Sequence, residues 1–330
     1  MKKKLSAFAA ALLLLLSLTA CGRDKGDKDT ASGDTRAVAL SAVVIARDDV
    51  PEDDIYALTA AIFENSEALA KQHDKGGELD LDLASSVTNV PYHPGAAKYF
   101  AEKGKTVAAV KDGAGVGSSR ALVLGTGGDS GVYYGFGSVL SSYVSGNTSL
   151  SVTALASGGS QANVGDLSAD SVQLALVQSD VMSCAYKGER LFDSPVTGFS
   201  VVAALYQEPV QIITTDPDIK SVADLAGKRV AIGASGSGVF FNAVDILSAY
   251  GINAVSDISP VYQSFSESAA SLENGGADAA FIVAGVPAKA VADLAAAKPV
   301  YLVSLDESHA NGLTASFPCF SACTIKADAY

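Results

Sequence analysis

The sequence predicts an α/β protein made of two lobes, each built on a sheet of parallel strands. Short apolar segments of strand length alternate along the chain with segments of helical periodicity, a pattern typical of parallel sheets covered on both faces. The alternation occurs in two sets, and a length of 330 residues favours about two domains. Apolar residues make up 48% of the chain and charged residues 18%, so there is enough apolar surface to build cores.

The elements before residue 121 begin with an apolar, β-branched run. Residues 38–46 (VALSAVVIA) predict a strand that is buried on both faces. Pro51 and the three acidic residues after it predict a helix start, because proline suits the first turn and acids favour the positive helix end. Apolar residues continue this helix to Phe63, and a second helix is predicted at 95–103. Residues 105–120 are small, polar and glycine-rich, and they predict a linker.

From residue 121 the chain repeats one order of elements: a strand, a glycine-rich loop and a helix. The predicted strands lie at residues 122–124, 151–156, 172–177, 201–205, 210–214, 229–232, 279–283 and 300–304. The predicted helices lie at residues 132–143, directly after 158–160, at 239–250 and at 288–297.

Three glycine-rich loops follow predicted strands, at residues 125–128 (GTGG), 158–160 (GGS) and 235–238 (SGSG). Ligands of open α/β sheets bind outside the carboxyl ends of the strands. Glycine lets the backbone approach a ligand, and free N–H groups at a helix start favour an anion. One glycine turn alone is usually structural, but three turns divided between two lobes predict a shared cleft. Such a cleft can hold an anion without lysine or arginine.

Composition and motifs argue against several classes of protein. A net charge of −13 disfavours binding to nucleic-acid phosphates. Residues 125–131 lack the third glycine of the dinucleotide fingerprint, and the sequence has neither a P-loop lysine motif nor a G-x-S-x-G elbow. The fragment GDSG at 128–131 resembles part of a serine-protease pattern, but it lies between a predicted strand and a helix. The three histidines are scattered, so no metal and no cofactor is expected.

Residues 1–20 predict a secretory signal peptide, with basic Lys2 to Lys4 followed by a short apolar run. The segment LTACG at 18–22 resembles a bacterial lipobox, which implies cleavage before Cys21 and lipidation of that residue. An ordinary signal with a chance cysteine is the alternative. Cleavage would remove three lysines and no acid, which changes the net charge from −13 to −16. Residues 21–37 predict a flexible tether, and the rest is expected to be extracytoplasmic.

Three cysteines remain if Cys21 carries lipid: Cys184, Cys319 and Cys323. At most one disulfide can form, and Cys319 and Cys323 are the nearest pair in the sequence. Buried free thiols are the favoured alternative.

Several segments together resemble the TAXI family of solute receptors (TRAP-associated extracytoplasmic immunogenic proteins). The matching segments are GTGG at 125–128, GVYY at 131–134, SGGSQAN at 157–163, ALVQSD at 175–180, VADLAGKRV at 222–230, GSG at 236–238, DAAF at 278–281 and AGVP at 284–287. The resemblance covers nearly all of residues 38–330. It implies a type II periplasmic-binding-protein-like fold, in which two α/β lobes enclose a ligand cleft.

The order of the segments differs from that of the family. The resemblance implies a chain that begins with the GTGG strand, whereas here the closing block at 38–104 comes first, and the linker at 105–120 follows it. We interpret this order as a circular permutation, with two misjoined gene pieces as the alternative. The expected first lobe is 38–207 and the second is 208–330. One strand is expected to cross between lobes near 205–214, and the other crossing, from Tyr330 into Val38, is expected to be cut. Strand 38–46 should still dock by sheet hydrogen bonds, with looser closure.

The resemblance implies a receptor that captures a small organic anion or amino acid and presents it to a TRAP-type transporter. Glutamate-like or 2-oxoacid-like solutes are the first candidates. The candidate ligand-binding residues are Thr126, Gly127, Gly128, Tyr134, Ser160, Asn163 and Gln178 from the first lobe, and Ser235, Ser237 and Gly285 from the second. A receptor that senses a solute without transport is one alternative. An enzyme on the same fold is less favoured, because no loop supplies a histidine, a cysteine or paired carboxylates.

Overall fold

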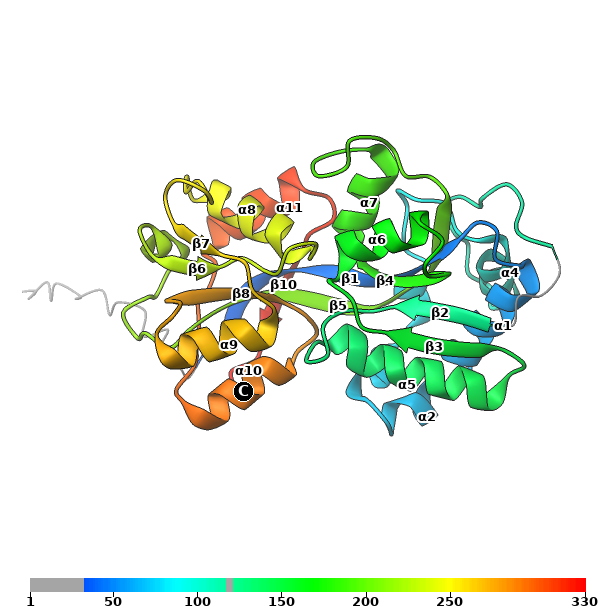
Figure 1. Cartoon of the computed structure of the whole chain (residues 1–330), viewed down its shortest axis with the longest axis horizontal. Helices are drawn as coiled ribbons and strands as arrows, with labels where there is room; N and C mark the ends of the chain where they lie inside the picture. Colours follow the sequence, from blue (N-terminus) through cyan, green and yellow to red (C-terminus); the bar gives the residue numbers. More distant parts are fainter. Residues whose placement is uncertain (1–32, 117–120) are drawn as a thin grey trace, which may run out of the picture.

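The computed structural model describes residues 33–116 and 121–330 of the chain. It contains two lobes joined by two long strands, β1 (Thr35–Arg47) and β5 (Phe199–Thr214), which run from one lobe into the other (Figure 1). The predicted signal peptide and the lipidation site at Cys21 lie outside the described residues. Within residues 33–116 and 121–330, no helix is long and apolar enough to cross a membrane.

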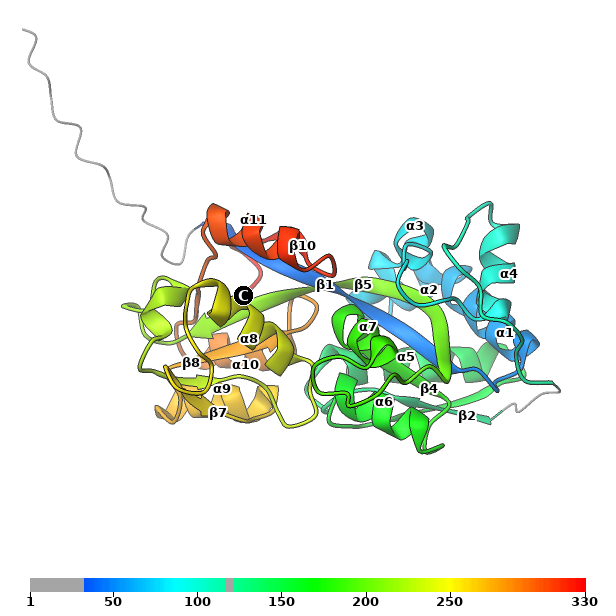
Figure 2. The same cartoon turned by 90° about the horizontal axis from the view of Figure 1, so that it is seen from above.

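The first lobe contains three parallel strands surrounded by helices. Strand β2 (Ala121–Gly125) lies between β3 (Ser151–Leu155) and β4 (Leu174–Gln178) and pairs in parallel with both. The helical elements of this lobe are α1 (Glu52–Phe63), α2 (Ser66–Ala70), η1 (Asp74–Glu78), α3 (Leu81–Ala84), α4 (Pro94–Glu102), α5 (Val132–Asn147), α6 (Ser160–Ser168) and α7 (Ser179–Lys187). Seen from above, α3 and α4 lie on one side of the crossing strands and α6 lies on the other (Figure 2).

The second lobe repeats this plan with a smaller set of parallel strands. Strand β6 (Arg229–Ala231) lies between β7 (Ser259–Val261) and β8 (Ala279–Val283) and pairs in parallel with both. The other elements of this lobe are η2 (Val222–Leu225), α8 (Val239–Ala249), α9 (Phe265–Asn274), α10 (Lys289–Ala297), β9 (Tyr301–Leu302), α11 (Glu307–Ser316) and β10 (Ser321–Ile325). The sequence patterns do not predict α9, α11, β7 or β10.

One mixed sheet connects the lobes, in the order β3-β2-β4-β1-β5-β8-β6-β7. Strand β1 is antiparallel to both β4 and β5, and β5 is antiparallel to β8. The prediction of purely parallel sheets is therefore wrong for the crossing strands. They lie against each other in opposite directions because one carries the chain into the first lobe and the other carries it out. The predicted fold class, two α/β lobes around a cleft, is confirmed.

Strand β5 corrects the prediction of two separate strands at 201–205 and 210–214. It runs unbroken for 16 residues, and the intervening residues 206–209 pair with β1. The predicted crossing near 205–214 is confirmed. Glu208 lies within this strand, and its side chain is buried.

Strand β1 is the second crossing, and it is not cut. Residues 35–39 pair with β10 of the second lobe, whereas residues 42–46 pair with β4 of the first. The expectation that Val38 begins after an interrupted crossing is therefore wrong. The prediction that strand 38–46 docks by sheet pairing is confirmed. Asp34, just before β1, meets the end of β10: its Oδ2 lies 2.7 Å from Lys326 Nζ.

The side chains of β1 enter two hydrophobic cores. Val38 and Leu40 belong to a smaller core within the second lobe, whereas Ala42 and Val43 belong to a larger core that fills the first lobe and extends to β8, α9 and α10 of the second. Strand β1 therefore contributes side chains to both cores and connects the two lobes. The exact lobe boundaries expected at 207 and 208 stay a prediction, since β5 runs straight through them.

Candidate functional site

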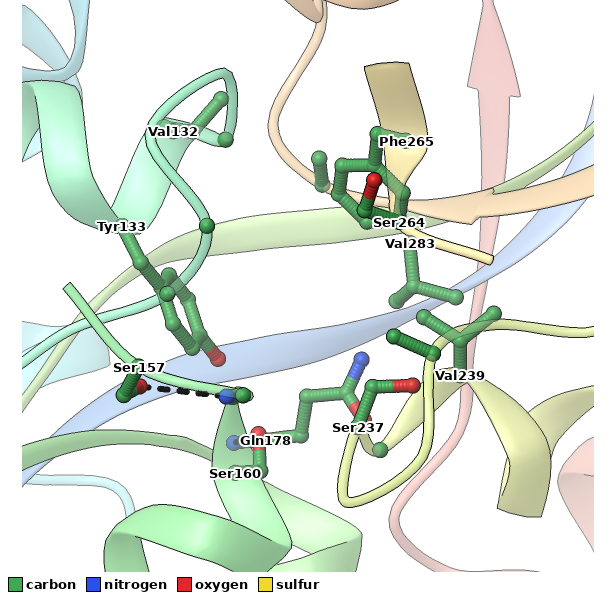
Figure 3. A pocket seen from close by; sticks show the side chains of 18 of the residues that line it. Val132, Tyr133, Ser157, Ser160, Gln178, Ser237, Val239, Ser264, Phe265 and Val283 are labelled. Atoms are coloured by element: carbon green, nitrogen blue, oxygen red, sulfur yellow. Dashed lines mark hydrogen bonds between the residues drawn. The ribbon is translucent and has the colours of Figure 1, made fainter. Parts of the chain in front are cut away.

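A cavity of about 110 Å³ lies between the two lobes. The first lobe contributes residues 127–128 and 130–133, residues 157–160 and Gln178, and the crossing strand β5 contributes Glu208. The second lobe contributes residues 234 and 237–239, 263–265 and 283–284. Figure 3 shows Tyr133 and Ser160 from the first lobe opposite Ser237, Val239, Phe265 and Val283 from the second. For scale, an engineered cavity of about 150 Å³ in another protein holds benzene, so this cavity suits a small solute.

Helix starts from both lobes face the cavity. The first turn of a helix leaves N–H groups without partners inside the helix, and the helix dipole makes that end positive. In α5 these groups belong to Val132 and Tyr133, and in α8 the first is on Val239; all three residues line the cavity. The cavity therefore offers backbone donors to an anionic group, as the glycine-rich loops predict.

The start of α6 has a different role from the predicted one. The backbone N–H groups of Gln161 and Ala162 donate to the carbonyl oxygen of Gly236, at 3.0 and 3.1 Å. Gly159 has a φ of 103°, and a Cβ atom there would lie 3.4 Å from Cα of Ser237. Glycine is suited to both demands, the left-handed backbone and the close approach. Two predicted anion donors are thus used to join the lobes.

Glu208 lies at the base of the cavity, on the crossing strand β5. Its side chain is 1% exposed, and Oε2 accepts a hydrogen bond of 2.7 Å from the hydroxyl of Tyr133. Burial raises the pKa of Glu208 to about 8, although the bond from Tyr133 and the charge of Lys75 act against this shift. Burial and the nearby Glu208 charge also raise the pKa of Tyr133 well above its ordinary value.

Several polar atoms in the cavity wall have no protein partner. Gln178 Oε1, Ser237 Oγ and Gln263 Oε1 are buried and accept no hydrogen bond from any residue that the structure describes. Buried polar atoms are almost always paired, and an unpaired one costs about 1–3 kcal/mol. These three atoms are therefore available to a bound solute that carries donors. Figure 3 shows the side chains of Gln178 and Ser237 close together at the contact between the lobes.

Half of the predicted ligand-binding residues line the cavity, and half do not. Those in the wall are Gly127, Gly128, Ser160, Gln178 and Ser237. Their contact with a ligand stays a prediction. Those outside the wall are Thr126, Tyr134, Asn163, Ser235 and Gly285.

The residues outside the wall have structural reasons for their positions. Thr126 Oγ1 donates to the carbonyl oxygen of Leu155 at 2.7 Å. Asn163 Nδ2 donates to the carbonyl oxygens of Thr126 and Leu176, both at 2.7 Å, and so ties together the ends of β2 and β4. Gly285 packs against the side chain of Lys75.

Tyr133, rather than Tyr134, reaches the cavity. The two residues are adjacent at the start of α5, and one residue turns a helix by about 100°. Ser235 is exposed. Sequence reasoning also missed Glu208, Gln263 and Phe265. For Glu208 a signal existed, namely a single acid inside a long apolar strand.

Further bonds join the lobes behind the cavity. Arg190, after α7, pairs with Asp245 of α8, with an Nη2–Oδ1 distance of 2.5 Å. Asn242 Nδ2 of α8 donates to Asp180 Oδ2 of α7 at 2.8 Å. Burial raises the pKa of Asp180 to about 6. Lys75 Nζ donates to the carbonyl oxygen of Val286 at 3.1 Å. We call the Arg190–Asp245 pair the interlobe ion pair.

Metal ligands and thiols were the other candidates for chemistry in the described part of the chain. In the described part of the chain, no group of three or more His, Cys, Asp or Glu side chains could hold a metal ion. Cys184, Cys319 and Cys323 are free thiols and half-buried. Burial raises the pKa of Cys184 to about 11, so this thiol is protonated at neutral pH.

Two lobes, two crossing strands and a cavity lined from both sides define a two-lobed α/β protein of the periplasmic-binding-protein architecture. The chain belongs to the NMT1-like family, which it matches over residues 24–104 and 124–330.

Solved structures with similarity to the chain include binding proteins for sulfonates and for arginine. The alkanesulfonate-binding protein SsuA from Xanthomonas axonopodis pv. citri, bound to MOPS, is 19% identical with a TM-score of 0.41, and the match covers 58% of this chain and 63% of that one. SsuA from Escherichia coli is 18% identical with a TM-score of 0.38, and the match covers 57% of each chain. An ancestral arginine-binding protein bound to arginine is 16% identical with a TM-score of 0.39, over 56% of this chain and 78% of that one. The chain thus spans less than two thirds of the length of the two SsuA proteins.

Proposed function

We propose that this protein is an extracytoplasmic solute-binding protein that captures a small organic anion or amino acid between its lobes. The observation that carries the proposal is the cavity, whose wall combines helix starts and unpaired polar atoms from both lobes. Contacts from two lobes at once make capture depend on closure. Membership of the NMT1-like family and the similarity to binding proteins for sulfonates and arginine agree with this function.

Binding without turnover fits the chemistry of the wall. Glu208 and Tyr133 are the ionisable side chains among the residues that line the cavity, and they are hydrogen-bonded to each other. No histidine, cysteine or lysine stands in the described wall to act as a nucleophile or a second acid–base group. We therefore expect the solute to leave the protein unchanged, which chromatography of the released solute would check.

A thermal-shift screen across amino acids, 2-oxo acids, dicarboxylates and sulfonates tests the proposal. A solute at free concentration c that binds only the folded protein stabilises it by RT ln(1 + c/Kd), which is about 2.7 kcal/mol at one hundred times Kd, and so raises the melting temperature. The Ser237→Ala and Gln178→Ala variants should lose most of that shift. A screen in which no compound raises the melting temperature would argue against solute capture.

The finer function rests on the resemblance to TAXI receptors. We propose that the loaded protein delivers its solute to the membrane subunits of a TRAP-type transporter, and that lipid on Cys21 anchors it to the bacterial cell membrane. A Cys21→Ala chain should appear in the soluble fraction of cells, whereas a variant that stays fully membrane-bound would contradict the anchor. Uptake of labelled solute by cells with and without the neighbouring transporter genes would separate transport from sensing.

We also propose that the chain order is a circular permutation. The family match breaks between residues 104 and 124, within the predicted linker. The start of β1 and the end of β10 lie side by side, since Asp34 accepts a hydrogen bond of 3.2 Å from the N–H of Ala327. A chain rejoined there and opened within 105–120 should fold and bind the same solute. Failure of that chain to fold would favour misjoined gene pieces.

A further inference from the structure

The acid at the base of the cavity has no cationic partner. Glu208 takes part in none of the ion pairs between described residues. The nearest buried ammonium group, on Lys75, is paired with Glu78 and bonded to the carbonyl oxygen of Val286. It also lies 5.5 Å from the ring centroid of Tyr206. The structure therefore leaves the carboxyl group of Glu208 with one neutral donor, the hydroxyl of Tyr133.

The helix starts, in contrast to Glu208, favour a negatively charged group on the solute. The first N–H groups of α5 and α8 line the same cavity and favour a negative group. No lysine or arginine lies among the described lining residues, so helix starts, including that of α9 at Phe265, are its main positive features. A solute that satisfies both regions carries an anionic group toward the helix starts and a cationic group toward Glu208.

Apart from Glu208 and Tyr133, the wall consists of uncharged polar residues and apolar side chains. Val132, Val239, Phe265 and Val283 line the cavity from both lobes, and the volume of about 110 Å³ leaves little room beyond a compact molecule. A second carboxylate on the solute would meet a wall that holds a buried acid and, among the described lining residues, no lysine or arginine. Burial of an unpaired charge is expensive, so such a solute fits poorly.

We propose that Glu208 recognises an ammonium group, and that the solute is an α-amino acid with a small uncharged side chain. This inference rests on the proposed capture of a solute. A 2-oxo acid of the same carbon skeleton lacks the group that Glu208 would bind, and a dicarboxylate adds a charge that the wall does not match. Gln178 Oε1, buried and unpaired, is a second acceptor in the wall for the ammonium hydrogens. The glutamate-like and 2-oxoacid-like candidates suggested by the resemblance are thereby replaced by neutral amino acids.

Binding of an ammonium group should release a proton. Glu208 has a pKa raised to about 8 by burial, so it is mostly protonated at pH 7 in the structure described here. An ammonium ligand favours the ionised carboxylate, and the affinity should rise with pH toward 8. The ionisable groups that act on Glu208 or on its neighbours are Tyr133, Tyr206, Lys75, Glu78 and Asp180.

The test is isothermal titration calorimetry on the full chain without its signal peptide, with matched pairs of solutes. The pairs are L-alanine with pyruvate, L-valine with its 2-oxo acid, and L-glutamate with 2-oxoglutarate. We expect L-alanine or L-valine to bind at least tenfold tighter than its 2-oxo acid and than L-glutamate. The Glu208→Gln variant should reduce the preference for the amino acid at least tenfold. Glu273→Gln, an exposed acid at the end of α9, serves as the control and should change nothing.

Each outcome decides the proposal. Equal or tighter binding of a 2-oxo acid, tightest binding of L-glutamate, or an unchanged preference in Glu208→Gln would overturn it while leaving solute capture intact. No binding by any of the six solutes would overturn this inference, and capture would then depend on the wider thermal-shift screen. Should Glu208→Gln fail to fold, titration of the unmodified protein in buffers of different ionisation enthalpy decides, because amino-acid binding must release a proton at pH 7.

Discussion

The interlobe ion pair between Arg190 and Asp245 should control how tightly the protein holds its solute. The pair joins a residue after α7 of the first lobe to α8 of the second, so it exists only while the lobes touch. Arg190→Met removes the charge and keeps an unbranched apolar stem against Phe241 and Phe317, whose rings lie 5.3 and 5.6 Å from the guanidinium carbon.

The size of the effect follows from the burial of the two side chains. Asp245 is 8% exposed and Arg190 is 30% exposed. Removing one partner of a fully buried pair costs about 3–5 kcal/mol, whereas an exposed pair contributes about 0–1 kcal/mol. An intermediate value of about 2 kcal/mol is therefore expected. Because solute binding includes closure, and 1.4 kcal/mol is tenfold in affinity, Kd should rise roughly 30-fold.

The assay is calorimetric titration of the best solute from the thermal-shift screen. Arg229→Met is the matched control, because Arg229 pairs with Asp278 within the second lobe, with an Nη2–Oδ1 distance of 2.6 Å. A double-mutant cycle with Asp245→Asn isolates the interaction between the two charges. An Arg190→Met affinity within twofold of the unmodified protein, or an equal loss in Arg229→Met, would refute the reasoning.

Three further outcomes are expected. Asn163→Ala removes the donor to two buried carbonyl groups and should lower the free energy of unfolding by about 1–3 kcal/mol per carbonyl, with solute affinity within threefold of normal, as seen by chemical denaturation and titration. Tyr330→Phe deprives the N–H of Ala288 (2.9 Å) and the buried Gln211 of their shared partner; urea unfolding should show a loss of about 1–3 kcal/mol, and an unchanged midpoint would contradict this. The raised pKa of Glu208 means that the folded protein holds a proton which the unfolded chain loses near pH 4.5. The free energy of unfolding should therefore fall as pH rises from 4.5 through 8, and the melting temperature of Glu208→Gln should fall less over that range than that of the unmodified protein.

Local patterns predicted the elements and the edge of the sheet where the cavity lies. The run VALSAVVIA has the apolar, β-branched composition of a strand buried on both faces, and β1 is that strand. The loop at 127–128 follows β2, and the loop at 158–160 follows β3, so both reach the carboxyl edge of the parallel set. Parallel strands necessarily bring such loops together, and no long-range information is needed to see it.

Side-chain direction at this edge could not be predicted in the same way. Tyr133 and Tyr134 are equivalent in sequence, and only the exact start of α5 decides which of them faces the cavity. Asn163 has the right chemistry for a solute, yet it bonds to two carbonyl groups at the ends of strands. The two carbonyls belong to residues 37 and 13 positions away from Asn163. Packing therefore decides whether the amide of Asn163 bonds to the backbone or to a solute.

The sequence by itself determined the α/β class, the order of most strands and helices, and the glycine-rich loops, because each depends on neighbouring residues only. The tertiary structure decided the rest. It paired β1 and β5 antiparallel across both lobes, which no local period encodes. It also turned the N–H groups at the start of α6 toward the second lobe and buried Glu208 beneath the cavity. These features arise only when the lobes meet, since each needs atoms from segments far apart in the chain.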